Sequence, residues 1–142
     1  MILAFLSVTT ATAVVPPETA YGHIAMEVIE APESTFVSYD AEKIVRSYFR
    51  DIPIMIEVAR CESTFRHQLA DGSVLTGRVD PADTGVMQIS KRYHESTARA
   101  MNLDLNDIYH NMAYARFLYE TQGTQPWSAS AFCWNKSLAA NI

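Results

Sequence analysis

Apolar residues recur at helical spacing over most of the chain that follows Asp40. A first helix is predicted directly behind Asp40, because Asp is a residue type that caps helix N-termini. The apolar positions of this helix follow an i, i+4 spacing and are Ile44, Val45, Tyr48 and Phe49.

A second helix is predicted over residues 53–65. Asp51 is available as its cap, and Pro53 is tolerated in a first helical turn. The segment is apolar on most sides, with only Glu57, Arg60 and Glu62 interspersed. A helix of this kind normally lies at the centre of a domain.

The pattern changes between residues 66 and 83. Asp71-Gly72 is a strong hairpin-turn signal, and strand-forming residues follow it at Val74, Leu75 and Val79. A small β-hairpin or a structured loop is predicted there.

Helical patterns return after Pro81. A short helical turn is predicted over 85–89, a helix over 93–101, and a long helix over 106–122 that stops at Gly123. An apolar segment, 127–134, closes the pattern. The predicted fold class is therefore mainly α, a helical domain with a small β-hairpin insertion.

Length and composition fit one domain. The chain has 142 residues and 49% apolar residues, enough for a single core. Residues 1–38 are predicted to be a signal-like segment and a flexible lead, because a short apolar run precedes small residues spaced like a cleavage site. The alternative is that the apolar run is the accidental remnant of a truncated membrane anchor at the start of the gene. The domain is expected over 39–135, a polar tail over 136–142, and the protein is expected to be exported.

The charge balance limits the possible partners. Eleven Lys and Arg residues face 16 Asp and Glu residues, which gives a net charge of −5. This balance argues against general nucleic-acid binding, and it gives no long-range attraction toward an anionic wall or membrane. The four His residues lack metal-ligand spacing and no phosphate-binding loop occurs, so neither a metal nor a cofactor is expected.

The two cysteines, Cys61 and Cys133, allow two interpretations. They could be buried reduced thiols, since free Cys is often buried. They could instead form one disulfide that closes a long loop, which requires an oxidising compartment.

Glu62 is the strongest candidate for chemistry. It ends the predicted buried helix among Val58, Cys61 and Phe65. Desolvation raises the pKa of such a carboxyl and keeps it protonated near neutral pH, the form that general acid catalysis requires. The alternative is an ordinary surface Glu at a helix end.

Two segments, which follow each other in the same order as in the family, resemble the lysozyme superfamily. Residues 61–65 read CESTF and residues 83–90 read DTGVMQIS; their E-S-x-F and G-x-M-Q-I motifs are similar to those of lytic transglycosylases and animal-type lysozymes. The resemblance extends to Asn111 and Trp127 and covers residues 44–134.

The resemblance implies an α+β lysozyme-like fold with a substrate cleft. It implies cleavage of the β-1,4 bond between N-acetylmuramic acid and N-acetylglucosamine in peptidoglycan, by a monomer whose partners are the glycan strands. Glu62 corresponds to the catalytic acid of the family. Substrate contacts are expected at Ser63, Gly85, Met87, Gln88, Ile89 and Trp127, although a Trp such as Trp127 is more often a core residue than a platform for a sugar ring.

A second carboxylate is expected at Asp83, where animal-type lysozymes carry theirs. Asp71 and Asp80 are rivals for this role, and Asp83 could instead cap a turn. Lytic transglycosylases use one Glu and close a 1,6-anhydro ring on the muramic acid, whereas hydrolysis uses two carboxylates. Both outcomes stay open.

The sequence departs from the transglycosylase pattern near its end. The family block A-Y-N-x-G is replaced by SAFCW at 130–134, so the Tyr hydroxyl that could bind the catalytic Glu is missing at Phe132. Tyr93, Tyr114 or Tyr119 could substitute, and a disulfide from Cys133 could hold the acid in place. Two alternatives follow: a peptidoglycan-binding module with a crippled site, and an unrelated helical interaction domain.

Overall fold

A computed structural model describes residues 40–139 of the chain. The predicted signal-like segment and lead, residues 1–38, lie outside the described residues, as does the end of the predicted tail. Within the described range, no helix is both long enough and apolar enough to cross a membrane.

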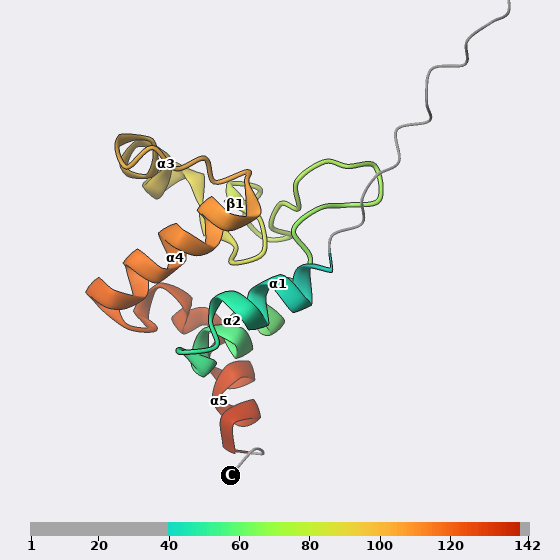
Figure 1. Cartoon of the computed structure of the whole chain (residues 1–142), viewed down its shortest axis with the longest axis vertical. Helices are drawn as coiled ribbons and strands as arrows, with labels where there is room; N and C mark the ends of the chain where they lie inside the picture. Colours follow the sequence, from blue (N-terminus) through green and yellow to red (C-terminus); the bar gives the residue numbers. More distant parts are fainter. Residues whose placement is uncertain (1–39, 140–142) are drawn as a thin grey trace, which may run out of the picture. The chain divides into compact units, whose positions relative to one another are not determined.

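The described part of the chain is mainly helical, as predicted (Figure 1). It contains one 3-10 helix, η1, and a two-stranded antiparallel sheet in which Asp83 pairs with Ser90 and Thr84 with Ile89. The helices are α1 (Ala41–Tyr48), α2 (Pro53–Ser63), α3 (Lys91–Ala100), α4 (Ile108–Gln122), η1 (Gln125–Ser130) and α5 (Ala131–Ala139), and the strands are β1 (Asp83–Thr84) and β2 (Ile89–Ser90).

Helix α1 begins as predicted, since the Asp40 side chain accepts a hydrogen bond from the backbone N–H of Lys43 at 3.1 Å. The predicted cap of α2 is wrong. Ile52 occupies the N-cap position without a side-chain bond, while Asp51 forms an ion pair with Arg116 of α4 at 2.8 Å. Arg116 lowers the pKa of Asp51 to about 2. Asp51 therefore connects the α1–α2 corner to α4.

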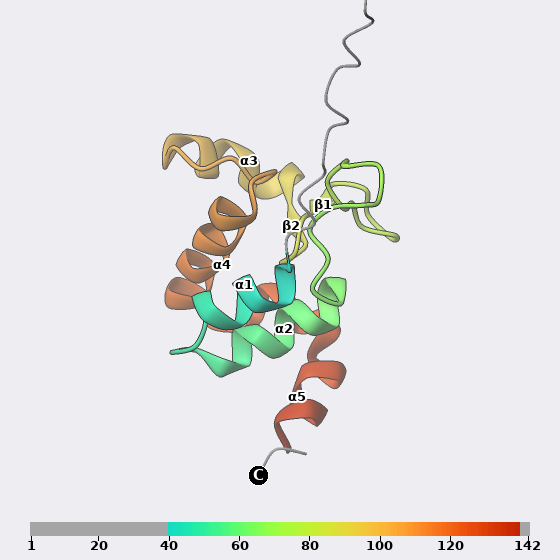
Figure 2. The same ribbon diagram turned by 45° about the vertical axis from the view of Figure 1, so that its right-hand side comes forward.

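Helix α2 lies at the centre of the helical packing. It contacts α1, α5 and η1, and Figure 2 shows α1 and α2 side by side. Its Met55, Val58 and Ala59 are fully buried. The predicted burial of this helix is confirmed, and with it the position of its last turn inside the domain.

The segment between α2 and β1 is a structured loop, one of the two alternatives predicted for it. Its turn at Asp71-Gly72 is confirmed, because Gly72 has φ 83° and the Asp71 carboxylate accepts a hydrogen bond from the Ser73 N–H at 3.0 Å. Gln68 and Val74 form only an isolated bridge. Val79 is 99% exposed and belongs to no strand.

The sheet forms farther along the chain, around the segment predicted to be a helical turn. That prediction is wrong: residues 85–88 are the turn that joins β1 to β2. Gly85 has φ 74° and Gln88 has φ 49°, and neither value fits a right-handed helix.

The C-terminal half follows the helical prediction closely. Helix α4 ends at Gly123, which has φ 62°. The predicted polar tail after Trp134 differs, because α5 continues to Ala139. Trp134 is buried and Cys133 is covalently joined to α2, so the first turn of α5 is fixed before the polar residues begin.

Candidate active site

Glu62 lies in the last turn of α2, where the helix is stopped abruptly. Thr64 and Phe65 follow it with φ values of 52° and 60°. Left-handed backbone at two successive residues other than glycine costs free energy and is often found at functional sites. The stop leaves the Glu62 carboxyl at the end of a buried helix, itself only partly buried.

The surroundings of Glu62 favour its neutral form. Burial raises the pKa of the carboxyl, the Ser130 hydroxyl lowers it by donating a hydrogen bond, and the negative charge of Asp83 raises it again. The net shift is upward. This is the direction predicted from the sequence, and burial is the cause predicted for it.

Ser130 is the hydrogen-bond partner of Glu62. Its Oγ lies 2.6 Å from Oε1 of Glu62 and 3.1 Å from the carbonyl oxygen of Trp127. The indole N–H of Trp127 donates in turn to the Met87 carbonyl at 2.9 Å. Helix η1 therefore connects Glu62 to the turn between β1 and β2.

That turn is held from its other side by two buried side chains. The Val86 N–H donates to Nδ1 of His67 at 3.1 Å, and the Met87 N–H donates to Oδ1 of Asn111 at 3.0 Å. The Asn111 amide nitrogen donates to the carbonyls of Thr84 and Leu105, both at 3.0 Å. A single buried Asn thus satisfies three backbone groups, which lie in β1, in the turn after β1 and in the segment before α4.

His67 is a structural residue of the interior. Its Nδ1 accepts from Val86, so the proton lies on Nε2, which donates to the Asn106 carbonyl at 2.7 Å. Burial lowers the pKa of His67, which keeps the ring neutral.

Most of the residues that were predicted to contact a substrate face the interior of the protein. Gly85 packs so closely that an added Cβ would lie 2.7 Å from Nδ2 of Asn111. The Ser63 hydroxyl donates to the Ala59 carbonyl within α2 at 3.0 Å. The buried members of the predicted set are Ser63, Gly85, Met87, Ile89 and Trp127. These residues build the support for a site, and their side chains are not on its surface.

Gln88 is the member of the predicted set that is not buried. Its side-chain nitrogen donates to the Gly85 carbonyl at 2.8 Å, which closes the turn on itself. The Gln88 side-chain oxygen makes no hydrogen bond within the described residues. This oxygen can therefore accept a hydrogen bond from a ligand.

Asp83 fits the second carboxylate better than its two rivals do. Its charge acts on Glu62, and its own pKa is raised, first by burial and then by the nearby Asp80. Asp80 is engaged by Arg92 at 3.0 Å and by the Ala82 N–H at 2.9 Å. Asp71 is bound to Ser73 in the exposed turn described above.

The disulfide between Cys61 and Cys133 is present, so the second interpretation of the cysteines is confirmed. Its Cα atoms are 6.0 Å apart, and it joins the residue before Glu62 to helix α5. Because Ser130 immediately precedes α5, the same cross-link fixes both members of the Glu62–Ser130 pair.

The three tyrosines that the sequence offered as partners of Glu62 make no hydrogen bond to it within residues 40–139. Tyr93 is exposed, Tyr114 is bonded to His94 at 3.1 Å, and Tyr119 packs against the core. Ser130 donates a hydrogen bond to Glu62, and it was not singled out from the sequence, although it lies in the segment 130–134 that departs from the transglycosylase pattern. Phe132 itself is 85% exposed.

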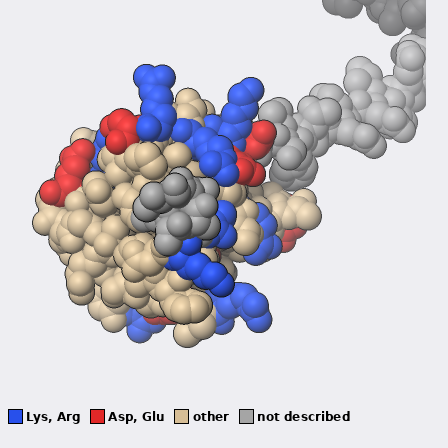
Figure 3. All heavy atoms as spheres, turned by 90° about the horizontal axis from the view of Figure 1, so that it is seen from below, with Lys and Arg blue, Asp and Glu red and all other residues tan. Residues whose placement is uncertain are grey.

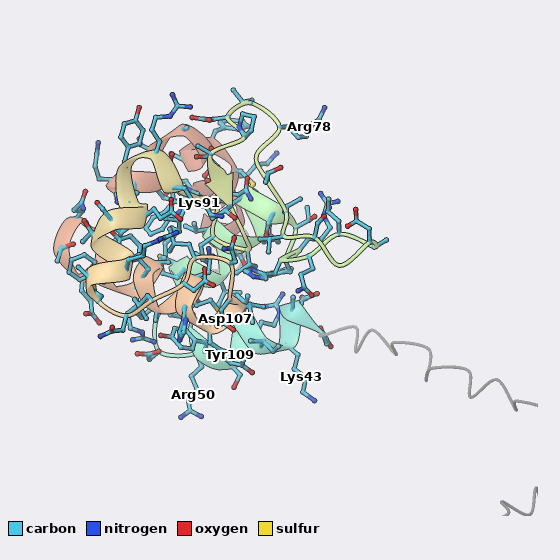
Figure 4. The ribbon with its side chains drawn as sticks, turned by 90° about the horizontal axis from the view of Figure 1, so that it is seen from above. Lys43, Arg50, Arg78, Lys91, Asp107 and Tyr109 are labelled. Carbon is cyan, nitrogen blue, oxygen red and sulfur yellow. A yellow bond between two sulfur atoms is a disulfide. The ribbon has the colours of Figure 1, made fainter. Side chains whose placement is uncertain are left out.

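A pocket of about 580 Å³ lies against the loop that follows Glu62. Its wall includes Phe65, His67 and Leu69 of the loop, together with the starts of α1 and α4. Figure 4 shows Asp107, the N-cap of α4, and Tyr109, in the first turn of α4, beside α1, and Arg78 pointing outward from the loop. Neither Glu62 nor Asp83 lines this pocket, so the predicted substrate cleft is not identified with it.

The charge of the described part differs from that of the whole chain. Residues 40–139 hold all 11 Lys and Arg residues but only 12 of the 16 Asp and Glu residues, a net charge of −1. On the face in Figure 3, Lys and Arg side chains lie in several separate places, some beside Asp or Glu. Repulsion from an anionic polymer is therefore much weaker for this part of the chain than the total charge indicates.

No group of three His, Cys, Asp or Glu side chains is placed to hold a metal ion within residues 40–139. The chemistry that the site can perform with its own groups is proton exchange at Glu62, with the charge of Asp83 nearby. Comparison with known proteins adds no family to this geometry: no protein-family model matches the chain, and no curated protein or solved structure is significantly similar to it.

Proposed function

We propose that this protein cleaves the β-1,4 bond between N-acetylmuramic acid and N-acetylglucosamine in peptidoglycan, with Glu62 as the general acid. The observation that carries the proposal is the environment of Glu62. A single carboxyl at the end of a buried helix is desolvated, has a raised pKa, and is bound by one hydroxyl. A carboxyl with a raised pKa keeps its proton to a higher pH than an ordinary Glu does, so it can protonate the oxygen of a leaving sugar.

Asp83 has the role of an electrostatic partner in this mechanism. Protonation of the glycosidic oxygen leaves positive charge on the sugar ring as the bond breaks. A carboxylate close enough to act on Glu62 is suitably placed to stabilise that charge. Gln88, with its free amide oxygen, would bind a sugar hydroxyl or acetamido group at the turn.

The lysozyme-like fold and the export of the protein belong to the same proposal. The resemblance of the E-S-x-F and G-x-M-Q-I segments supports the fold, and the helix–loop–hairpin–helix order of α2, β1, β2 and α3 is compatible with it. The Cys61–Cys133 disulfide supports an oxidising compartment, such as the periplasm or the cell exterior.

Replacing Glu62 tests the function directly. Glu62→Gln keeps the size of the side chain but removes the exchangeable proton, so release of muropeptides from purified peptidoglycan should fall by about 10²-fold or more. Glu120→Gln, at an exposed position of α4, is the matched control and should leave the release unchanged. Unchanged release by Glu62→Gln would remove the proposal.

The masses of the released products decide the type of cleavage. A 1,6-anhydro product is lighter than the hydrolysis product by one water, and it would assign lytic transglycosylation. A reducing muramic acid would assign hydrolysis, in which Asp83→Asn should then also reduce the rate.

A second candidate is a peptidoglycan-binding module with little or no activity. It is favoured by the burial of five of the six predicted substrate contacts. Sedimentation with insoluble peptidoglycan, without release of soluble sugar from the wild-type protein, would establish this candidate in place of the enzyme.

A further inference from the structure

The contacts of Ser130 carry an inference that deepens the proposed function and rests on it. The Ser130 hydroxyl has one proton and two acceptors within hydrogen-bond distance, namely Oε1 of Glu62 at 2.6 Å and the Trp127 carbonyl at 3.1 Å. It can donate to only one of them at a time. The contact with Glu62 is the shorter of the two.

We propose that Ser130 is the positioning residue of the reaction: it holds Oε1 of Glu62, leaves Oε2 to exchange the proton, and moves its own proton between Glu62 and the Trp127 carbonyl as the charge of Glu62 changes. Oε2 makes no hydrogen bond within the described residues, so it is the oxygen that can face a substrate. Ser130 keeps its proton throughout and changes only the acceptor.

The proton balance follows from this geometry. When Oε2 gives its proton to the leaving oxygen, Glu62 becomes negative and the Ser130 hydroxyl donates fully to Oε1. Glu62 then takes a proton from the attacking hydroxyl, whether of water or of the substrate, and loses its negative charge. Oε1 becomes a weaker acceptor, so the Trp127 carbonyl competes for the proton of the Ser130 hydroxyl. One side chain thus accommodates both charge states of the acid.

The position of Ser130 suits this role, because it is fixed from three directions. The Trp127 carbonyl also accepts from the indole N–H of Trp134 at 3.1 Å, and the Trp127 indole is bound to Met87. The disulfide at Cys133 anchors the helix that follows. Ser130 therefore cannot move away from Glu62 without disturbing the turn or α5.

Three variants test the inference: Ser130→Ala removes the hydroxyl, Ser130→Thr keeps it, and Ser128→Ala is a control at an exposed position of η1. The carboxyl of Glu62 is titrated by carbon NMR in each variant, with Glu62→Gln used to assign the signal. Ser130 lowers the pKa of Glu62, so the midpoint should move to higher pH in Ser130→Ala. It should stay at the wild-type value in Ser128→Ala and return to it in Ser130→Thr.

The kinetics should change in the same variants. In Ser130→Ala, kcat should fall about tenfold, the size expected for the loss of one hydrogen bond to a charged group, with little change in KM. The descending limb of kcat/KM should move to higher pH with the titration. An unchanged midpoint in a protein that cleaves peptidoglycan would overturn the role of Ser130 alone, whereas absence of cleavage by the wild-type protein would overturn the proposed function.

Discussion

The turn at residues 85–88 and the last turn of α2 meet through η1 but are held in different ways. The turn is anchored by His67 and Asn111, which are 5% and 0% exposed and bind the N–H groups of two successive residues. Glu62 is only partly buried, and one hydroxyl binds it. The first region is a backbone fixed by buried polar groups, and the second is an ionisable side chain with one adjustable hydrogen-bond partner within residues 40–139.

This difference distinguishes the residues that support the site from the residue that exchanges a proton. Buried, fully satisfied polar networks favour one backbone geometry, because every displaced partner leaves a polar atom without a hydrogen bond. A group that must gain and lose a proton requires an environment that tolerates both charge states. Substitutions in the turn should therefore act on stability, and substitutions around Glu62 on proton exchange.

The largest effect is expected for Asn111→Leu. Leucine has the same branched shape and the same number of non-hydrogen side-chain atoms, although it is bulkier, and it leaves the Met87 N–H and the carbonyls of Thr84 and Leu105 without their partner. Each unsatisfied buried group costs about 1–3 kcal/mol, so the free energy of unfolding should fall by about 4 kcal/mol or more. Urea unfolding followed by circular dichroism measures the loss.

The exposed Asn135 of α5 provides the comparison for that experiment. Asn135→Leu should change the free energy of unfolding by less than about 0.5 kcal/mol. Similar losses in both variants would show that the buried amide is not what fixes the turn.

A smaller effect is expected for alanine at Gly85, compared with alanine at Gly123. Both glycines have positive φ, 74° and 62°, so both substitutions strain the backbone. An added Cβ at Gly85 would also approach Cε1 of His67 to 2.8 Å, whereas nothing lies within 4 Å at Gly123. Gly85→Ala should therefore cost roughly 1–3 kcal/mol more than Gly123→Ala in urea unfolding. Equal costs would mean that the turn can shift away from its buried partners.

The helices could be predicted from the sequence because their signals are local. The i, i+4 spacing and the Asp40 cap locate α1, and the apolar run locates α2. The turn at 85–88 could not be predicted in this way. Its backbone is fixed by Asn111, which is distant in sequence, and a pattern of mostly apolar residues does not distinguish a buried turn from a helix.

The carboxylates of the candidate site could be selected from the sequence, whereas the residues that support them could not. Glu62 could be selected because helix burial implies desolvation. The motif 85–89 could be singled out from the sequence as a unit, but most of its side chains face inward, a direction that depends on tertiary packing. Ser130 lies 68 residues from Glu62, and no spacing rule predicts a hydrogen bond across that separation.

The smallest effect concerns the pH dependence of stability at Glu62. Burial raises the pKa of Glu62 above its ordinary value of 4.5, so between these two pKa values the native state binds more protons than the unfolded state. The free energy of unfolding therefore falls as the pH rises from about 4.5 through the native pKa. Glu62→Gln cannot lose a proton, and it should become more stable than the wild type as the pH rises, with little difference at pH 4.

Urea unfolding of the wild type, Glu62→Gln and Glu120→Gln between pH 4 and pH 8 measures this difference. The lowered pKa of His67 makes all three proteins less stable as the pH falls below about 6.5, and that contribution cancels between them. Glu120 is exposed, so Glu120→Gln should follow the wild type across the range. If Glu62→Gln also follows the wild type, the carboxyl is solvated like any surface Glu, and the contrast with the buried turn disappears.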